Sequence, residues 1–137
     1  MGTSIKEVMT SQVKTCEPDT TVIEAAKVMA KEDVGPVPIV EQGRLTGIVT
    51  DRDIVVRVVA EGRDPSSTTV GEIASRDLVT VSPDDDLDAA LKQLAQSQVR
   101  RIPVVEGDRL VGIVAQADIA RLGSDAKTGE VVEEISR

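Results

Sequence analysis

A hydroxyl, two carboxylates and a guanidinium stand side by side in the run Thr50-Asp51-Arg52-Asp53, directly after a stretch of apolar residues. This pattern predicts a helix that begins where a buried strand ends. The free backbone N–H groups and the positive dipole end of such a helix favour an anion. The run therefore predicts a helix start at which a phosphate could bind.

A second interpretation of the same run needs no ligand. Thr50 and Asp53 have the spacing of the hydroxyl and the acidic residue in a capping box. Such a cap contributes ~1 kcal/mol to a helix. Both interpretations stay open for this run. They also stay open for Asp118, the counterpart of Asp53 later in the chain, whose only role could be to cap a helix.

Few other residues could do chemistry. The chain has no histidine, which excludes a histidine general base, a Ser-His or Cys-His dyad and a histidine metal ligand. Cys16 is the only cysteine, and its apolar neighbours predict a buried structural thiol that neither forms an intramolecular disulfide nor binds a metal alone. The acidic run Asp84-Asp85-Asp86-Asp88 stands at an expected helix start, where negative charge is stabilised anyway. We expect no metal site, no required cofactor and no enzymatic activity.

Charge and composition exclude some classes of binding partner. Twenty-four acidic and 16 basic side chains give a net charge of −8, which repels phosphate backbones and anionic membranes. No aromatic residue is present to stack on a base, and no apolar run approaches the ~20 residues of a membrane span. We expect a cytoplasmic protein with no nucleic-acid or membrane partner. Phe, Tyr, Trp, His and Asn are all missing, which leaves open a deliberately reduced alphabet or a GC-rich natural source.

The sequence matches itself once, at a shift of 65 residues and without a gap, from about Ile5 to Ile54 in the first copy. Identical pairs under this shift include Thr15/Thr80, Pro38/Pro103, Gly47/Gly112 and Asp53/Asp118. A half of this length buries only ~60% of its unfolded surface, so the two copies are expected to fold together. The predicted parts are a first repeat with its connector at 1–67, a second repeat at 68–123 and a C-terminal tail at 124–137.

Periodicity assigns the elements of the first repeat. A short strand is expected at Val13–Cys16, an amphipathic helix from Val22, a hairpin at Val37–Val40 and Leu45–Val49, and a second helix from Thr50 to about Ala60. One apolar stripe is expected along that second helix, formed by Ile54, Val55, Val58 and Val59.

The second repeat predicts the same order. The expected elements are a strand at Leu78–Val81, a helix from Leu87, a hairpin at Ile102–Val105 and Leu110–Val114, and a shorter helix near Gln116–Leu122. The hairpin strands are almost wholly apolar, which indicates burial on both faces. The predicted fold is therefore α/β (α+β), built from two β-α-β-β-α units.

This order, together with the run Gly47-Ile48-Val49-Thr50-Asp51-Arg52-Asp53, resembles the CBS (Bateman) domain pair. The run matches the family signature of a glycine, apolar residues, a threonine or serine and an aspartate. The resemblance covers about Ile5 to Leu122, and the chain is similar to a stand-alone bacterial CBS pair. It implies two repeats related by pseudo-two-fold symmetry, two clefts for AMP, ADP, ATP or S-adenosylmethionine, and a disc-shaped homodimer.

The resemblance also implies roles in the first cleft. The Thr50 hydroxyl would donate to a phosphate, Arg52 would add positive charge, and Asp53 would accept hydrogen bonds from the ribose hydroxyls. Asp51 lies within the motif. The adenine would pack against Lys14, Thr15, Cys16, Gly35, Pro36, Val37 and Pro38.

The second cleft departs from the pattern, because Ala115 stands where the hydroxyl is expected. Asp118 could still hold a ribose and Arg100 and Arg101 a phosphate, although these arginines could equally be a solvated pair or partners for neighbouring aspartates. The remaining implied residues are Thr80, Ile102 and Pro103. We expect one competent cleft and a degenerate second one.

Two functions remain. The first is a non-catalytic sensor that binds an adenosine-containing ligand and is read by an unknown downstream protein. The second is a ligand-free dimerisation module with vestigial clefts. Ala115 and the missing aromatic residues favour the second, whereas the Thr50-Asp51-Arg52-Asp53 run favours the first.

Overall fold

The computed structural model describes residues 3–76, 78–97 and 101–115. They form two compact units. The continuous unit runs from Lys14 to Leu78, and the split unit combines residues 3–13 with residues 79–115. The predicted helix near Gln116–Leu122 and the tail at 124–137 lie outside the described residues. Among the residues described, no helix combines the length and the apolar character that crossing a membrane requires.

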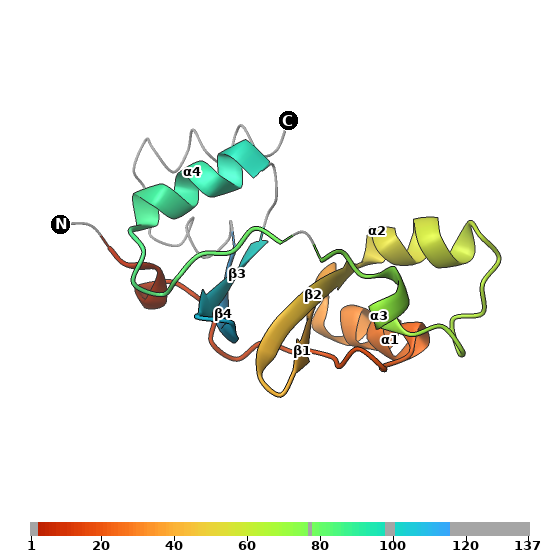
Figure 1. Ribbon diagram of the computed structural model, residues 1–137. Coiled ribbons are helices and arrows are strands. Elements are labelled where there is room, and N and C mark those ends of the chain that lie inside the picture. The colour runs from red at the N-terminus through yellow and green to blue at the C-terminus, as the bar shows by residue number, and fades with distance from the viewer. Residues whose placement is uncertain (1–2, 77, 98–100, 116–137) are drawn as a thin grey trace. The chain divides into compact units, whose positions relative to one another are not determined.

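The continuous unit packs one long helix against a β-hairpin, as the periodicity predicts. Its elements are α1 (Val22–Glu32), β1 (Pro36–Glu41), β2 (Arg44–Thr50), α2 (Asp51–Ile54), η2 (Val55–Val59) and α3 (Val70–Ile73) (Figure 1). The helix buries Val22, Ala25 and Met29 against the hairpin, at the spacing expected of an amphipathic helix.

The split unit repeats this arrangement. Its elements are η1 (Ile5–Glu7), α4 (Leu87–Ser97), β3 (Arg101–Glu106) and β4 (Arg109–Ala115). The helix buries Ala90, Leu91 and Leu94 in a core that also contains Ile5. Both hairpins are confirmed, and they share one register: Pro38 faces Ile48 in the first and Pro103 faces Ile113 in the second.

The predicted strands at Val13–Cys16 and Leu78–Val81 are wrong, because each is reduced to a single bridging residue. The Cys16 N–H donates to the Pro38 carbonyl at 3.0 Å, and the Cys16 carbonyl accepts the Val40 N–H at 2.9 Å. The next parallel bond toward the N-terminus would need an N–H from Pro38, which proline lacks. Pro103 stops the ladder at Val81 in the same way.

The predicted stripe on the second helix is also wrong. Val58 is fully buried, but Val55 is 58% and Val59 66% exposed. After Ile54 the helix widens to π geometry, so that the Ala60 N–H donates to the Val55 carbonyl five residues back at 2.9 Å. The wider turn breaks the 3.6-residue period on which the prediction rested. Val55, Val56 and Val59 form an exposed group that we call the valine patch.

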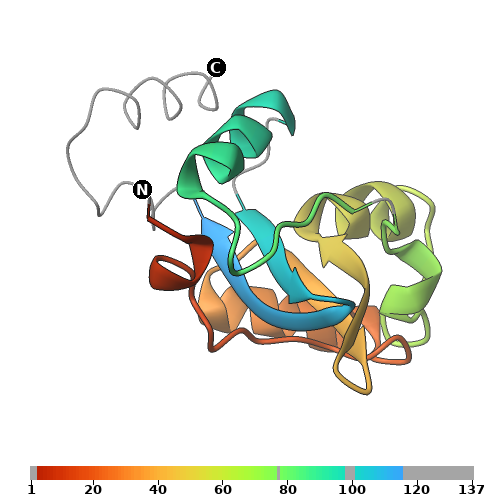
Figure 2. The same ribbon diagram turned by 60° about the vertical axis from the view of Figure 1, so that its left-hand side comes forward.

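Each unit is completed by the first segment of the other repeat. In the split unit, Thr10 and Ile113 exchange two backbone hydrogen bonds of 2.8 and 2.9 Å. Figure 2 shows the red N-terminal segment beside the blue hairpin of this unit. In the continuous unit, Ser75 and Ile48 exchange two bonds of 3.0 Å. These are the same positions under the 65-residue shift, so the exchange is reciprocal. The predicted boundary at residue 67 separates the sequence repeats. The boundaries between the compact units lie instead after residues 13 and 78.

Two glycines make this exchange possible. A Cβ added at Gly112 would lie 2.8 Å from the Thr10 carbonyl oxygen. A Cβ added at Gly47 would lie 3.1 Å from the Ser75 carbonyl oxygen. A side chain at Gly112 would therefore force the exchanged segment to move, whereas one at Gly47 would make an unusually tight contact with it.

Capping boxes begin both exchanged segments. The Glu7 carboxylate accepts the Ser4 N–H at 2.7 Å, and the Glu72 carboxylate accepts the Thr69 N–H at 2.8 Å. These backbone hydrogen bonds, followed by those from the same residues' hydroxyls, lower the pKa of both glutamates. The boxes fix the ends of both segments in the same way.

The exchange predicts where a core substitution in the N-terminal segment will act. Ile5→Ala should cost about 2–5 kcal/mol, because the Ile5 side chain is fully buried in the split unit. Amide hydrogen exchange, followed by mass spectrometry, should accelerate in β3 and β4 and remain near the wild-type rate in β1 and β2. Ile23→Ala, at an exposed position of α1, is the control. Faster exchange in β1 and β2 alone would contradict the assignment.

Candidate functional site

The candidate site is the junction between β2 and α2, and a capping box closes it. The Thr50 hydroxyl accepts the Asp53 N–H at 3.1 Å, and the Asp53 carboxylate accepts the Thr50 N–H at 2.9 Å. The capping interpretation of the run is therefore confirmed.

The entry of β1 lies beside this junction. Pro36 faces Thr50 across the hairpin, and the Asp51 N–H donates to the Gly35 carbonyl at 3.1 Å. A Cβ at Gly35 would lie 3.1 Å from the Asp51 carboxylate, so any larger residue here would have to displace that side chain by a few tenths of an ångström. The hairpin register thus brings together two groups of predicted site residues whose paired members are 14 and 16 positions apart in sequence.

The junction does not offer the free N–H groups that the sequence predicted. The Arg52 N–H donates to the Asp51 carboxylate at 2.9 Å. With the bonds of Thr50, Asp51 and Asp53 described above, four consecutive backbone N–H groups already have acceptors within the protein. The amides that the sequence expected to be free are paired with the protein's own oxygens, and a phosphate could use them only by displacing those acceptors.

The junction nevertheless retains groups that can contact a ligand. Thr50 uses its hydroxyl oxygen as an acceptor, and no acceptor for its hydroxyl proton is found among the described residues. The Asp53 side chain is 17% exposed, and its second oxygen lies 3.9 Å from Nε of Arg57. A carboxylate oxygen has lone pairs beyond the one used in the cap. Capping and ligand binding are therefore compatible at this junction.

The predicted adenine wall is only partly available. Val37 is fully buried and Cys16 is 7% exposed, and both belong to the core of the continuous unit. Pro38 is buried as well, so these three side chains cannot cover a ligand surface as predicted. Lys14 and Thr15 are exposed, and Gly35 and Pro36 are half-buried.

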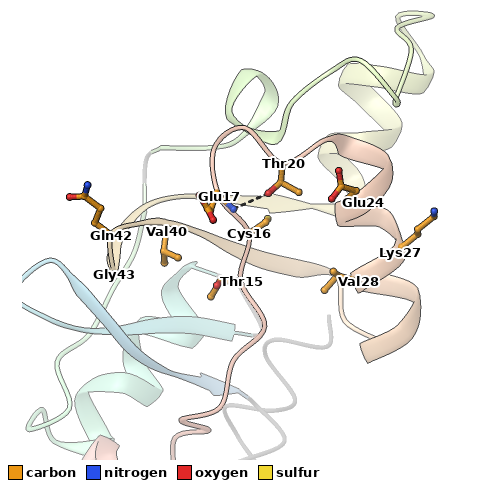
Figure 3. A pocket seen from close by; sticks show the side chains of 10 residues that line it. All are labelled: Thr15, Cys16, Glu17, Thr20, Glu24, Lys27, Val28, Val40, Gln42 and Gly43. Atoms are coloured by element: carbon orange, nitrogen blue, oxygen red, sulfur yellow. Dashed lines mark hydrogen bonds between the residues drawn. The ribbon is translucent and has the colours of Figure 1, made fainter.

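A groove of about 660 Å³ lies on another part of the continuous unit (Figure 3). Its lining residues are Thr15, Cys16, Glu17, Thr20, Glu24, Lys27, Val28, Val40, Gln42 and Gly43. The groove includes Thr15 and Cys16 but no residue of the β2–α2 junction. Sequence reasoning missed its other residues, which carry no spacing signal beyond one exposed face of α1.

The second predicted cleft is described only in part. Thr80 and Arg101 are half-buried, whereas Ile102 and Pro103 are buried. The Ile102 side chain belongs to the core of the split unit, which leaves only its backbone for the predicted ligand contact. Arg100 and Asp118 lie outside the described residues.

Metal binding finds no support in the part of the chain that the structure describes. No group of three or more Cys, Asp or Glu side chains there is arranged to hold an ion. Burial raises the pKa of the Cys16 thiol to about 11, which keeps it protonated at neutral pH. Its Sγ lies 4.0 Å from the Pro38 carbonyl oxygen. These features fit the predicted structural thiol.

The model of the CBS domain matches this chain twice, at residues 5–60 and 70–125. The chain belongs to the CBS domain family. The CBS domain-containing protein YhcV of Bacillus subtilis is 48% identical over 117 residues, which cover 85% of this chain and 83% of YhcV. The chain is thus a CBS pair, a regulatory module.

Solved CBS pairs have the same fold. One is the crystal structure of Hypoxic Response Protein I with two coordinated zinc ions, whose sequence is 39% identical to this chain. Its TM-score is 0.78, and the match covers 88% of this chain and 98% of that one. The CBS domain pair of protein MJ0100, in complex with 5′-methylthioadenosine and S-adenosyl-L-methionine, is 31% identical. Its TM-score is 0.76, over 89% of this chain and 96% of that one.

Because Cys16 is buried, we expect its thiol to react slowly with reagents in solution. Because the pKa of the thiol is raised to about 11 and its sulfur is buried, native protein should react with a thiol-specific disulfide reagent at pH 8 far more slowly than unfolded protein, by about two orders of magnitude. The rate should rise with pH up to about 11. Equal rates in native and denatured protein would show that the thiol is accessible.

Proposed function

We propose that this CBS pair binds an adenosine-containing ligand at the β2–α2 junction and passes its occupancy to a partner protein. The observation that carries the proposal is Asp53, a partly exposed carboxylate fixed by the capping box with lone pairs left for ribose hydroxyls. Thr50 adds a hydroxyl proton beside it. The adenosyl compounds named for the MJ0100 pair are ligands of this class.

The adenine would lie on aliphatic and backbone surface. The chain has no aromatic side chain, and the accessible candidates nearest the junction are Gly35 and Pro36. Affinity for the nucleoside would therefore come mainly from the ribose, since hydrogen bonds to a charged carboxylate are stronger than neutral ones.

Regulation requires a difference in affinity between two arrangements of the module. A ligand shifts such an equilibrium only by as much as it prefers one arrangement. A protein partner would then recognise the favoured arrangement, without any chemical step in this chain. The partner remains the downstream protein that the sequence does not identify.

The proposal is tested by removing the ribose acceptor. Asp53→Ala should lower the affinity for adenosine by about tenfold or more, because a hydrogen bond to a charged group contributes about 1.5–3 kcal/mol. Equilibrium dialysis measures this affinity directly from the absorbance of adenine, because a chain without Trp or Tyr hardly absorbs at the same wavelength. Glu72→Ala removes the acidic residue of the Thr69 capping box in the same unit and is the matched control. Unchanged affinity in Asp53→Ala, or equal loss in both variants, would refute the ribose contact.

We further propose that the module forms a homodimer through the valine patch. Three branched aliphatic side chains on one short helix are 47–66% exposed, which is unfavourable in water unless a partner covers them. A second copy offers the same patch in a self-complementary contact. A dimer that binds no adenosine would instead favour the ligand-free assembly module.

If the valine patch forms the dimer interface, a single substitution in it should change the molar mass of the protein in solution. Val56→Glu should convert a dimer into a monomer in size-exclusion chromatography with light scattering, because it places a charge in the covered patch. Ile23→Glu, at an exposed apolar position of α1, should leave the dimer intact. A monomeric wild type, or a Val56→Glu dimer, would contradict this interface.

A further inference from the structure

A smaller cavity, of about 240 Å³, lies beside Gly47 in the continuous unit. Ile39, Glu41 and Thr46 line it from the hairpin, and Ala74 and Arg76 line it from the exchanged segment. It shares no residue with the β2–α2 junction or with the groove of Figure 3. The cavity is therefore separate from both places already considered for a ligand.

The corresponding space in the split unit is filled. Under the 65-residue shift, Gly47 corresponds to Gly112 and Ala74 to Met9. A Cβ added at Gly112 would lie 2.8 Å from the Met9 sulfur, whereas one added at Gly47 would lie 3.5 Å from the Ala74 Cβ. The long Met9 side chain thus covers its glycine, in the way methionine fills irregular gaps, and the short Ala74 side chain leaves the space open.

Two more lining residues differ between the units, and both differences add polar groups to the open cavity. Arg76 stands where the split unit has Ser11, and Thr46 stands where it has Val111. The residue at position 41 is acidic in both units. The continuous unit therefore combines the open space with a guanidinium and a hydroxyl that the split unit does not have at these positions.

The two charges that line the cavity are opposite and unpaired. Glu41 and Arg76 are exposed, and within the part of the chain that the structure describes neither side chain forms an ion pair or a hydrogen bond. The Thr46 hydroxyl donates to the Ile39 carbonyl at 3.3 Å, which leaves its oxygen free to accept. A molecule that bridges the two charges needs an ammonium for Glu41 and a carboxylate for Arg76, whose guanidinium can bind a carboxylate through two parallel hydrogen bonds.

We propose that this cavity binds a free α-amino acid with an aliphatic side chain. Its carboxylate lies on Arg76, its ammonium on Glu41, and its side chain against Ile39 and Ala74. The cavity of about 240 Å³ is smaller than the ~300–1,000 Å³ of pockets for drug-sized ligands, which suits a molecule of this size. The ligand would tie the hairpin to the exchanged segment, and it would do so independently of the adenosine site.

Amide NMR of the labelled full chain, titrated with three probes, tests both charge contacts. The probes are L-leucine, leucinamide, which lacks the carboxylate, and 4-methylpentanoate, which lacks the ammonium. Saturable shifts are expected at Gly47, Gly71 and Ala74, which line the cavity. Leucine should bind about fivefold more tightly than either analogue, because an exposed charge pair contributes modestly. Equal affinity for the three probes, or no saturable shift with leucine, overturns the proposal.

Substitutions assign each charge of the ligand to its residue. Arg76→Gln should weaken leucine about fivefold and leave leucinamide, which has no carboxylate, within about twofold. Glu41→Gln should likewise weaken leucine and leave 4-methylpentanoate unchanged. Arg44→Gln removes the same charge from the residue that faces Glu41 across the hairpin, outside the cavity lining, and should not weaken leucine. An equal loss in Arg44→Gln and Arg76→Gln overturns the proposal, because general charge would then explain it.

Filling the cavity is the most direct test of its location. Ala74→Met introduces the residue that the split unit uses at the same position, and it should abolish leucine binding while circular dichroism shows that the fold is kept. Undiminished binding in a folded Ala74→Met variant overturns the site. Should this variant fold poorly, the substitutions of the exposed Arg76 and Glu41 still decide the proposal.

Discussion

The two reciprocal pairs of backbone hydrogen bonds, Thr10 with Ile113 and Ser75 with Ile48, hold each hairpin to a segment from the other repeat. Each pair passes over a glycine at which a Cβ would lie 2.8 or 3.1 Å from the exchanged segment. Because Ile5 and Val70 enter the two cores with these segments, each compact unit needs residues from both repeats. Neither repeat therefore completes a core by itself, which fits the expectation that the two repeats fold together.

The same constraint prepares the candidate site. Ser75 pairs with β2 two residues before Thr50, while Cys16 pairs with the other edge of the hairpin through Pro38 and Val40. The end of β2 is thereby held on both sides of the hairpin, and the capping box fixes the first turn that follows it. The capping box holds the helix start in place. It also lowers the affinity for an anion, since the acceptors that stabilise the helix start occupy the amides a phosphate would use.

Much of this architecture could be predicted from the sequence, because it depends on local patterns. The i, i+3, i+7 spacing of Val22, Ala25 and Met29 predicted α1, and the 65-residue shift predicted two matching hairpins. The exchange of segments could not be predicted, since nothing in a repeat says which copy its first residues will pack on. The π turn after Ile54 was missed because apolar periodicity assumes a regular α-helix. At the site, residue types left capping and phosphate binding both open, and only the hydrogen bonds of Asp51 and Asp53 show that the amides are occupied.

The central claim, that an adenosyl ligand sits at the junction of β2 and α2, is tested most directly by amide NMR of the labelled protein titrated with 5′-methylthioadenosine. The account predicts saturable shifts at Gly35, Thr50 and Asp53, with one common dissociation constant, and no such shifts at Thr69 and Glu72 in the matched capping box. Saturable shifts confined to the groove residues Thr20, Glu24 and Lys27, or no shifts at any concentration, would contradict it.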